Sequence, residues 1–85
     1  MTMDALKGEL EATYEEIVDV LSRRLESVWD ILKDVQKESI SMQEKVEAVR
    51  AAVGDLRQAI VQSSLDDGDR ARFEAHLKKM EDLLA

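Results

Sequence analysis

Apolar side chains recur at helical spacing through the first half of the chain. Nine of them, spaced three or four residues apart, fall within an arc of about 100° on a helical projection: Leu6, Leu10, Tyr14, Ile17, Leu21, Leu25, Val28, Leu32 and Val35. Four more widen this face to about 180°: Val18, Val20, Trp29 and Ile31. A face this wide is typical of a helix that contacts two neighbours, so we predict a long first helix over about residues 4–38.

From Tyr14 to Val35 the spacing of this stripe changes at one point. Leu21 is preceded and followed by a step of four residues, at Ile17 and Leu25. Two such steps in succession shift the heptad phase as a stutter does, which works against a regular supercoil there.

A narrower stripe follows in the second half of the chain. Its members alternate steps of four and three, as in a coiled-coil seam: Met42, Val46, Val49, Val53, Leu56, Ile60 and Ser63. This pattern predicts a second helix over about residues 41–64. Ser41 and Glu44 have the spacing of a capping box, which favours a turn near Glu38–Ser41.

An alternative is one uninterrupted helix, because the apolar phase continues through position 39. A helix from Asp4 to Ser63 would be about 90 Å long and would need a second copy to bury its stripe. The alternative fold is therefore a coiled-coil dimer of long helices, each with a short back-folded C-terminal helix.

The segment SSLDDGD predicts the next turn, since Ser, Asp and Gly favour turns and N-caps. A third helix should cover about residues 69–84, with Asp69 as its N-cap. Folding back at this turn pairs the two apolar stripes in register: Phe73 with Ile60, Leu77 with Leu56, Met80 with Val53 and Leu84 with Val49. We therefore predict one all-α domain over residues 1–85, an antiparallel three-helix bundle with a long first helix.

A first helix of this length should extend beyond the second. Residues 4 to about 14 would then overhang, with Leu6, Leu10 and Tyr14 on one face. An apolar patch with an acidic rim is typical of an interface, so the overhang is either a partner or dimer contact or a frayed N-terminus.

Composition and charge restrict the classes of function and partner that the chain can have. The 85 residues include no cysteine and no proline, and the net charge is −7. Six acids face one lysine in residues 1–20, whereas residues 21–60 balance seven acids with seven bases. This charge opposes binding to nucleic acid or anionic membranes and favours a basic or neutral protein partner. There is no apolar run of membrane-spanning length and no signal-peptide pattern, so we expect a cytoplasmic protein.

Residues for catalysis or metal binding are few. His76, the one histidine, borders the apolar stripe of the third helix and has no acid at helical spacing to orient it, so we expect a structural role. Asp66–Asp69 lack the alternate ligands and the twelfth-position glutamate of a calcium loop. We predict no enzyme activity, no cofactor and no metal.

The size and helix plan resemble the small all-helical chorismate mutases, whose sites collect several cations around a dicarboxylate substrate. Lys7 and Arg24 stand at about the separation of that family's first two arginines. The third cation would fall at Val35, which cannot hold a carboxylate. An enzyme of this type is therefore a remote alternative.

Arg24 is the polar exception within the apolar arc. As a residue of a continuous helix it would have no acid one turn before or after it, so its head group either reaches water or pairs with an acid elsewhere. Trp29, at the margin of the face, either covers the chain's own core or contacts a partner.

These features together predict a protein-interaction module, such as an adaptor, chaperone or complex subunit, that self-associates or docks on a larger protein. The predicted partner-binding residues are Leu6, Glu9, Leu10, Glu11, Tyr14, Glu15, Glu16, Arg24 and Trp29. The alternative, based on net charge, is an acidic inhibitor that covers a nucleic-acid-binding surface of its target.

Overall fold

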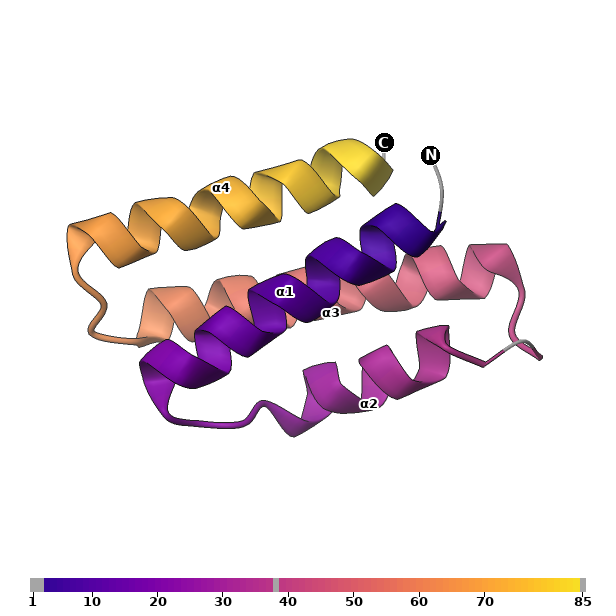
Figure 1. The fold of residues 1–85 in the computed structure, drawn as a ribbon, viewed down its shortest axis with the longest axis horizontal. Coiled ribbons are helices and arrows are strands. Elements are labelled where there is room, and N and C mark those ends of the chain that lie inside the picture. The colour runs from indigo at the N-terminus through magenta and orange to yellow at the C-terminus, as the bar shows by residue number, and fades with distance from the viewer. Residues whose placement is uncertain (1–2, 38, 85) are drawn as a thin grey trace.

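The computed structural model describes residues 3–37 and 39–84, and these residues form four helices with no strand. The helices are α1 (Met3–Leu21), α2 (Glu26–Val35), α3 (Met42–Gln62) and α4 (Asp67–Leu84). Consecutive helices run in opposite directions (Figure 1). The prediction of an all-α fold is confirmed. None of these four helices is long and apolar enough to cross a bilayer.

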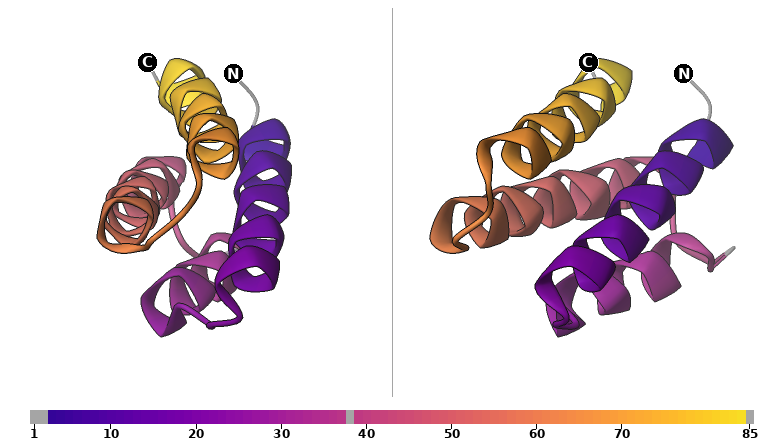
Figure 2. Two further views of the ribbon diagram at one scale, coloured as in Figure 1. Left: turned by 90° about the vertical axis from the view of Figure 1, so that its left-hand side faces the viewer. Right: turned by 60° about the vertical axis from the view of Figure 1, so that its left-hand side comes forward.

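The four helices sit at the corners of a diamond when seen end-on, with α2 and α4 at opposite corners (Figure 2). Helix α1 contacts each of the other three, whereas α2 and α4 do not meet in the part of the chain described. The chain therefore forms two helical hairpins, α1–α2 and α3–α4. Helices α1 and α3 each contact all three of the other helices.

The predicted long first helix is wrong, and with it the three-helix count. Residues 22–25 interrupt the helix, and Ser22 adopts a positive φ of 50°. The interruption coincides with the phase shift at Leu21 and Leu25. Because the chain reverses there, the stripe of α2 is buried within the same molecule and needs no second copy.

The second turn agrees better with the sequence. Helix α2 ends at Val35, and Ser41 caps α3 by accepting a hydrogen bond from the backbone N–H of Glu44 at 3.2 Å. The Ser41 side of the predicted capping box is confirmed. Glu38, where the predicted turn begins, lies outside the described residues. The alternative of one helix running through this region is wrong.

The hairpin of α3 and α4 follows the predicted register. All eight apolar residues of the four expected pairs are buried. Arg57 on α3 forms ion pairs with Glu74 and Glu81 on α4, and Arg50 donates to the backbone carbonyl of Leu84 at 3.2 Å. The predicted N-cap is displaced, because the Asp66 carboxylate accepts from the backbone N–H of Asp69 at 2.7 Å.

The predicted overhang is also wrong. Leu6 and Leu10 are fully buried, and Tyr14 is 5% exposed. The early end of α1 lets this helix lie along α4, α3 and α2, so its apolar face completes the core. The alternative of a frayed terminus fails from Met3 onward, where the chain is helical.

Candidate functional site

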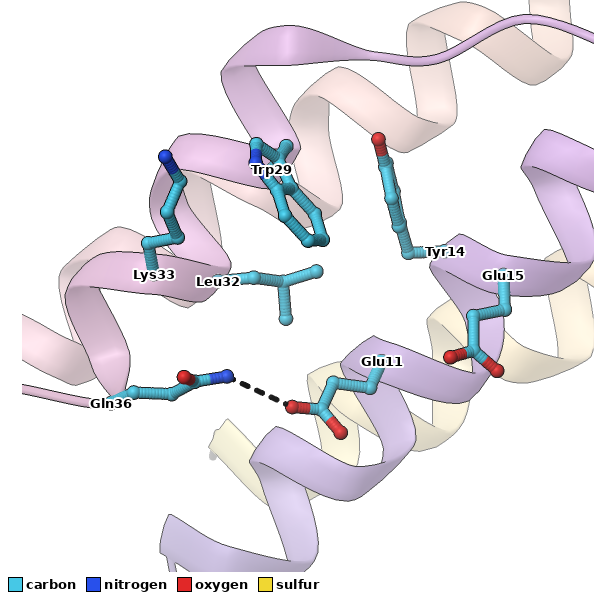
Figure 3. A pocket seen from close by; sticks show the side chains of 7 residues that line it. All are labelled: Glu11, Tyr14, Glu15, Trp29, Leu32, Lys33 and Gln36. Atoms are coloured by element: carbon cyan, nitrogen blue, oxygen red, sulfur yellow. Dashed lines mark hydrogen bonds between the residues drawn. The ribbon is translucent and has the colours of Figure 1, made fainter.

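A cleft of about 360 Å³ lies between α1 and α2. Its lining comes from both helices (Figure 3): Glu11, Tyr14, Glu15, Trp29, Leu32, Lys33 and Gln36. The antiparallel turn at residues 22–25 brings these two sets of side chains together, although they are far apart in the sequence.

Two aromatic rings form much of the cleft floor. The ring centroids of Tyr14 and Trp29 are 6.2 Å apart, with planes inclined by 29°. The Tyr14 hydroxyl donates to the backbone carbonyl of Leu25 at 3.3 Å, which fixes the ring against the turn. Trp29 is partly buried and Leu32 is almost wholly buried, so the floor is apolar and only its upper surface is open.

The rim of the cleft is polar. Glu11 and Glu15 stand one turn apart on α1, opposite Lys33 on α2 and Gln36 at the C-cap of that helix (Figure 3). The Gln36 amide donates to Glu11 Oε1 at 3.2 Å and links the two rims. Glu15 is exposed and makes no ion pair with any described residue, so its carboxylate is available to a ligand.

Arg24 lies beside the cleft, over the indole of Trp29. Its guanidinium carbon is 4.2 Å from the Trp29 ring centroid, and its Nε is 3.6 Å from a Glu26 carboxylate oxygen. Half of the Arg24 side chain is exposed. The residue that the pattern placed in an apolar arc therefore reaches water, because it belongs to a turn and no longer to a helix.

A second polar cluster joins α1 to α4 around His76. Its Nδ1 lies 3.1 Å from Glu9 Oε1 in a hydrogen bond, and its Nε2 lies 2.9 Å from Glu16 Oε2. That Glu16 oxygen is buried and has no hydrogen-bond partner among the described residues, so its contact with the ring is electrostatic.

Two cationic side chains complete this cluster. Lys79 Nζ lies 3.2 Å from Glu9 Oε2, and Arg72 Nε lies 4.0 Å from Glu16 Oε2. Burial raises the pKa of Glu9, but the hydrogen bonds and charges of His76 and Lys79 outweigh it and hold that pKa below its ordinary value. The cluster ties two helices together by charge.

No group of three or more acidic, His or Cys side chains in the described ranges could hold a metal ion.

The predicted partner-binding residues thus separate into three groups. Glu11, Tyr14, Glu15 and Trp29 line the cleft, with Arg24 beside it. Leu6 and Leu10 belong to the core, where no partner can reach them in the folded chain. Glu9 and Glu16 hold His76.

Sequence reasoning assigned Trp29 to the site but missed the other residues of the α2 side of the cleft, which are Leu32, Lys33 and Gln36. On a continuous helix these three residues would lie about 26 Å or more from Glu15. The phase shift at Leu21 and Leu25 was the available signal that the chain could fold back. The acids around His76 had no such signal, because Glu9 is 67 positions away.

The sequence matches no family model, no curated protein and no solved structure.

Proposed function

We propose that this chain is a non-enzymatic protein-interaction module that binds a segment of a partner protein in the α1–α2 cleft. The observation that carries the proposal is the combination of a partly exposed Trp29 in the cleft floor with the free Glu15 carboxylate on the rim. Tyr14 and Trp29 supply the floor, and Glu15 supplies a free carboxylate above it.

The chemistry of the cleft specifies the segment. An apolar side chain of the partner would cover the exposed surface of Trp29, which releases water from the floor. A basic side chain on the same segment would pair with Glu15, whose charge also steers the encounter. Lys33 on the opposite rim disfavours a second basic group there. The expected ligand is therefore a short segment with one apolar anchor and one flanking lysine or arginine.

Selection from a displayed library of short peptides tests this proposal. Peptides that bind the wild-type protein should share an apolar residue next to a basic one. Binding of a synthetic consensus peptide should shift the emission of Trp29, the chain's one tryptophan. If no peptide is enriched, or if the enriched peptides bind equally well to Trp29→Ala, the proposal is wrong.

Matched charge reversals localise the binding. Glu15→Lys on the rim should weaken binding of the consensus peptide by about tenfold, the effect of about 1.4 kcal/mol. Glu47→Lys makes the same charge change at an exposed position of α3 and should leave affinity within about twofold at moderate salt. Equal losses in both variants would point to net charge and not to the cleft.

The alternative of an acidic inhibitor predicts a different salt dependence. Glu9 and Glu16, two acids of the predicted charged end, are already paired with Lys79 and Arg72 of α4. Binding that persists at about 0.5 M salt favours the apolar cleft over charge mimicry. The enzyme alternative has no specific observation in its favour, since Lys7 and Arg24 line different surfaces and Val35 is buried.

A further inference from the structure

The turn between α1 and α2 has a conformation that its sequence does not favour. Ser22 adopts a φ of 50°, a left-handed conformation that glycine and asparagine accept more readily than serine. The turn SRRL contains neither of those residues and no proline, and arginine and leucine are good helix formers. A local conflict between sequence and backbone is therefore concentrated at Ser22.

The start of α2 repeats this conflict. Leu25 stands at its N-cap with extended backbone angles and provides no side-chain hydrogen bond to the first turn. Helices α3 and α4 both receive such a bond, from Ser41 and Asp66. A continuous helix across residues 22–25 would give the first N–H groups of α2 carbonyl partners in the preceding turn.

Little holds the turn closed. Ser22, Arg23 and Arg24 are exposed and Leu25 is partly buried, so the turn residues themselves bury little apolar surface. Among the described residues, the hydrogen bond from Tyr14 to the Leu25 carbonyl is the one side-chain hydrogen bond to the turn backbone.

The contacts of α1, in contrast, are specific, and the same contacts can form between two copies of the chain. Its apolar face fills the core, and Glu9 and Glu16 meet His76, Lys79 and Arg72 on α4. All of these contacts can form equally well with α4 of a second copy, because an exchanged element finds the same surroundings. Short hinges under strain favour such an exchange.

We propose that two copies of this chain form a dimer by exchanging α1. Residues 22–25 become helical, and residues 3–35 form one helix of about 50 Å. Each α1 then packs against α2, α3 and α4 of the other copy. In this dimer the cleft and the His76 cluster are each assembled from two chains. The proposal is independent of the function proposed above, since it requires no ligand.

Two substitutions at Ser22 test the exchange with opposite expected effects. Glycine accepts the left-handed conformation and disfavours helix, whereas alanine does the reverse. Each of these two effects amounts to about tenfold, so together they amount to about a hundredfold per hinge. Because a dimer contains two hinges, the dimer Kd of Ser22→Ala should be about ten-thousandfold lower than that of Ser22→Gly. Light scattering over a wide range of protein concentration, after refolding from urea, measures both values beside the wild type.

A distance measurement distinguishes an exchanged dimer from one that associates side by side. The side chains of Glu11 and Gln36 touch in the closed hairpin, with 3.2 Å between Oε1 and Nε2. In a straight helix their Cα atoms would be about 38 Å apart. Nitroxide labels on the double variant Glu11→Cys with Gln36→Cys, diluted with an excess of unlabelled chain, report this distance within one chain. The natural chain has no cysteine to interfere.

The expected result is a long distance in the dimer fraction and a short one in the monomer. Absence of a dimer in the wild type and in Ser22→Ala overturns the proposal. Equal dimer Kd values for Ser22→Ala and Ser22→Gly overturn it too, as does a short distance within the dimer. If Ser22→Ala does not fold, the labelled chain with its natural hinge decides between the two outcomes.

Discussion

The two hairpins of this molecule differ in how well their local sequence agrees with their structure. In α3–α4, an aspartate caps the second helix, the apolar seam stays in register, and Arg57 bridges to Glu74 and Glu81. In α1–α2, the turn contains a serine with positive φ, the second helix starts without a side-chain cap, and a cleft separates part of the two helices.

This difference indicates a division of roles. Where propensity, capping, packing and charge agree, the hairpin is a stable scaffold. Departures from such agreement concentrate at functional sites in natural proteins. The departures here cluster around the cleft, which is why we propose binding for α1–α2 and a stabilising role for α3–α4.

The largest effect is expected from Leu77→Ala in the scaffold hairpin. Leu77 is fully buried, so truncation leaves a cavity and should lower the free energy of unfolding by about 2–5 kcal/mol. A domain of this length has about 4–13 kcal/mol in total, so the variant should be close to unfolding. Urea denaturation measures the change, with Lys78→Ala on the exposed face as control. A loss below about 1 kcal/mol would contradict a well-packed seam.

The next largest effect concerns the link between the hairpins. Glu9→Gln removes charged hydrogen bonds with His76 and Lys79 and should cost about 1–2 kcal/mol at neutral pH. Since the pKa of Glu9 is lowered on folding, its contribution is present above the ordinary value of 4.5 and is lost as pH falls through the folded value. The difference between wild type and variant should therefore shrink in acid. If the difference in the free energy of unfolding between wild type and Glu9→Gln does not change with pH, the Glu9 carboxylate does not link the hairpins as described.

Two substitutions at the turns should have opposite signs. Asp66→Ala removes the cap of α4 and should destabilise the monomer by about 1 kcal/mol. Ser22→Gly relieves the left-handed strain and should stabilise it by about 1 kcal/mol. Thermal unfolding at low protein concentration compares them directly. Destabilisation by both would mean that the α1–α2 turn is as well adapted to its sequence as the other.

The smallest effect is expected from Arg24→Leu beside the cleft. Its ion pair with Glu26 and its contact with Trp29 are half exposed, so stability should change by less than about 0.5 kcal/mol. The emission of Trp29 should change nonetheless, because a cation leaves its ring face. If Arg24→Leu instead unfolds the protein, Arg24 holds helices of the bundle together.

The parts of the fold that the sequence predicted are those with local signals. The seam of α3 and α4 repeats without error, and Ser41 with Glu44 marked the start of α3 correctly. The break at residues 22–25 had a weaker signal, since a phase shift there fits both a distorted helix and a turn. Tertiary packing of α2 on α1 and α3 decides between these two, and no local pattern contains that information.

The candidate site was predicted in part for the same reason. Tyr14 and Trp29 were recognisable as aromatics at the edge of an apolar face, and Glu11 and Glu15 as acids nearby. Their assembly into one cleft depends on the chain reversal. Leu6 and Leu10 were assigned to a surface because the first helix was expected to overhang, and its early end moved them into the core.

Native-state hydrogen exchange followed by NMR tests the contrast between the two hairpins most directly. Amides of α2, at residues 29–35, should exchange through local opening at a free energy below that of global unfolding. Amides of buried positions in α3 and α4, such as Leu56 and Leu77, should exchange only with global unfolding. Equal protection of α2 and the α3–α4 seam would contradict the account, because α1–α2 would then be as rigid as its scaffold.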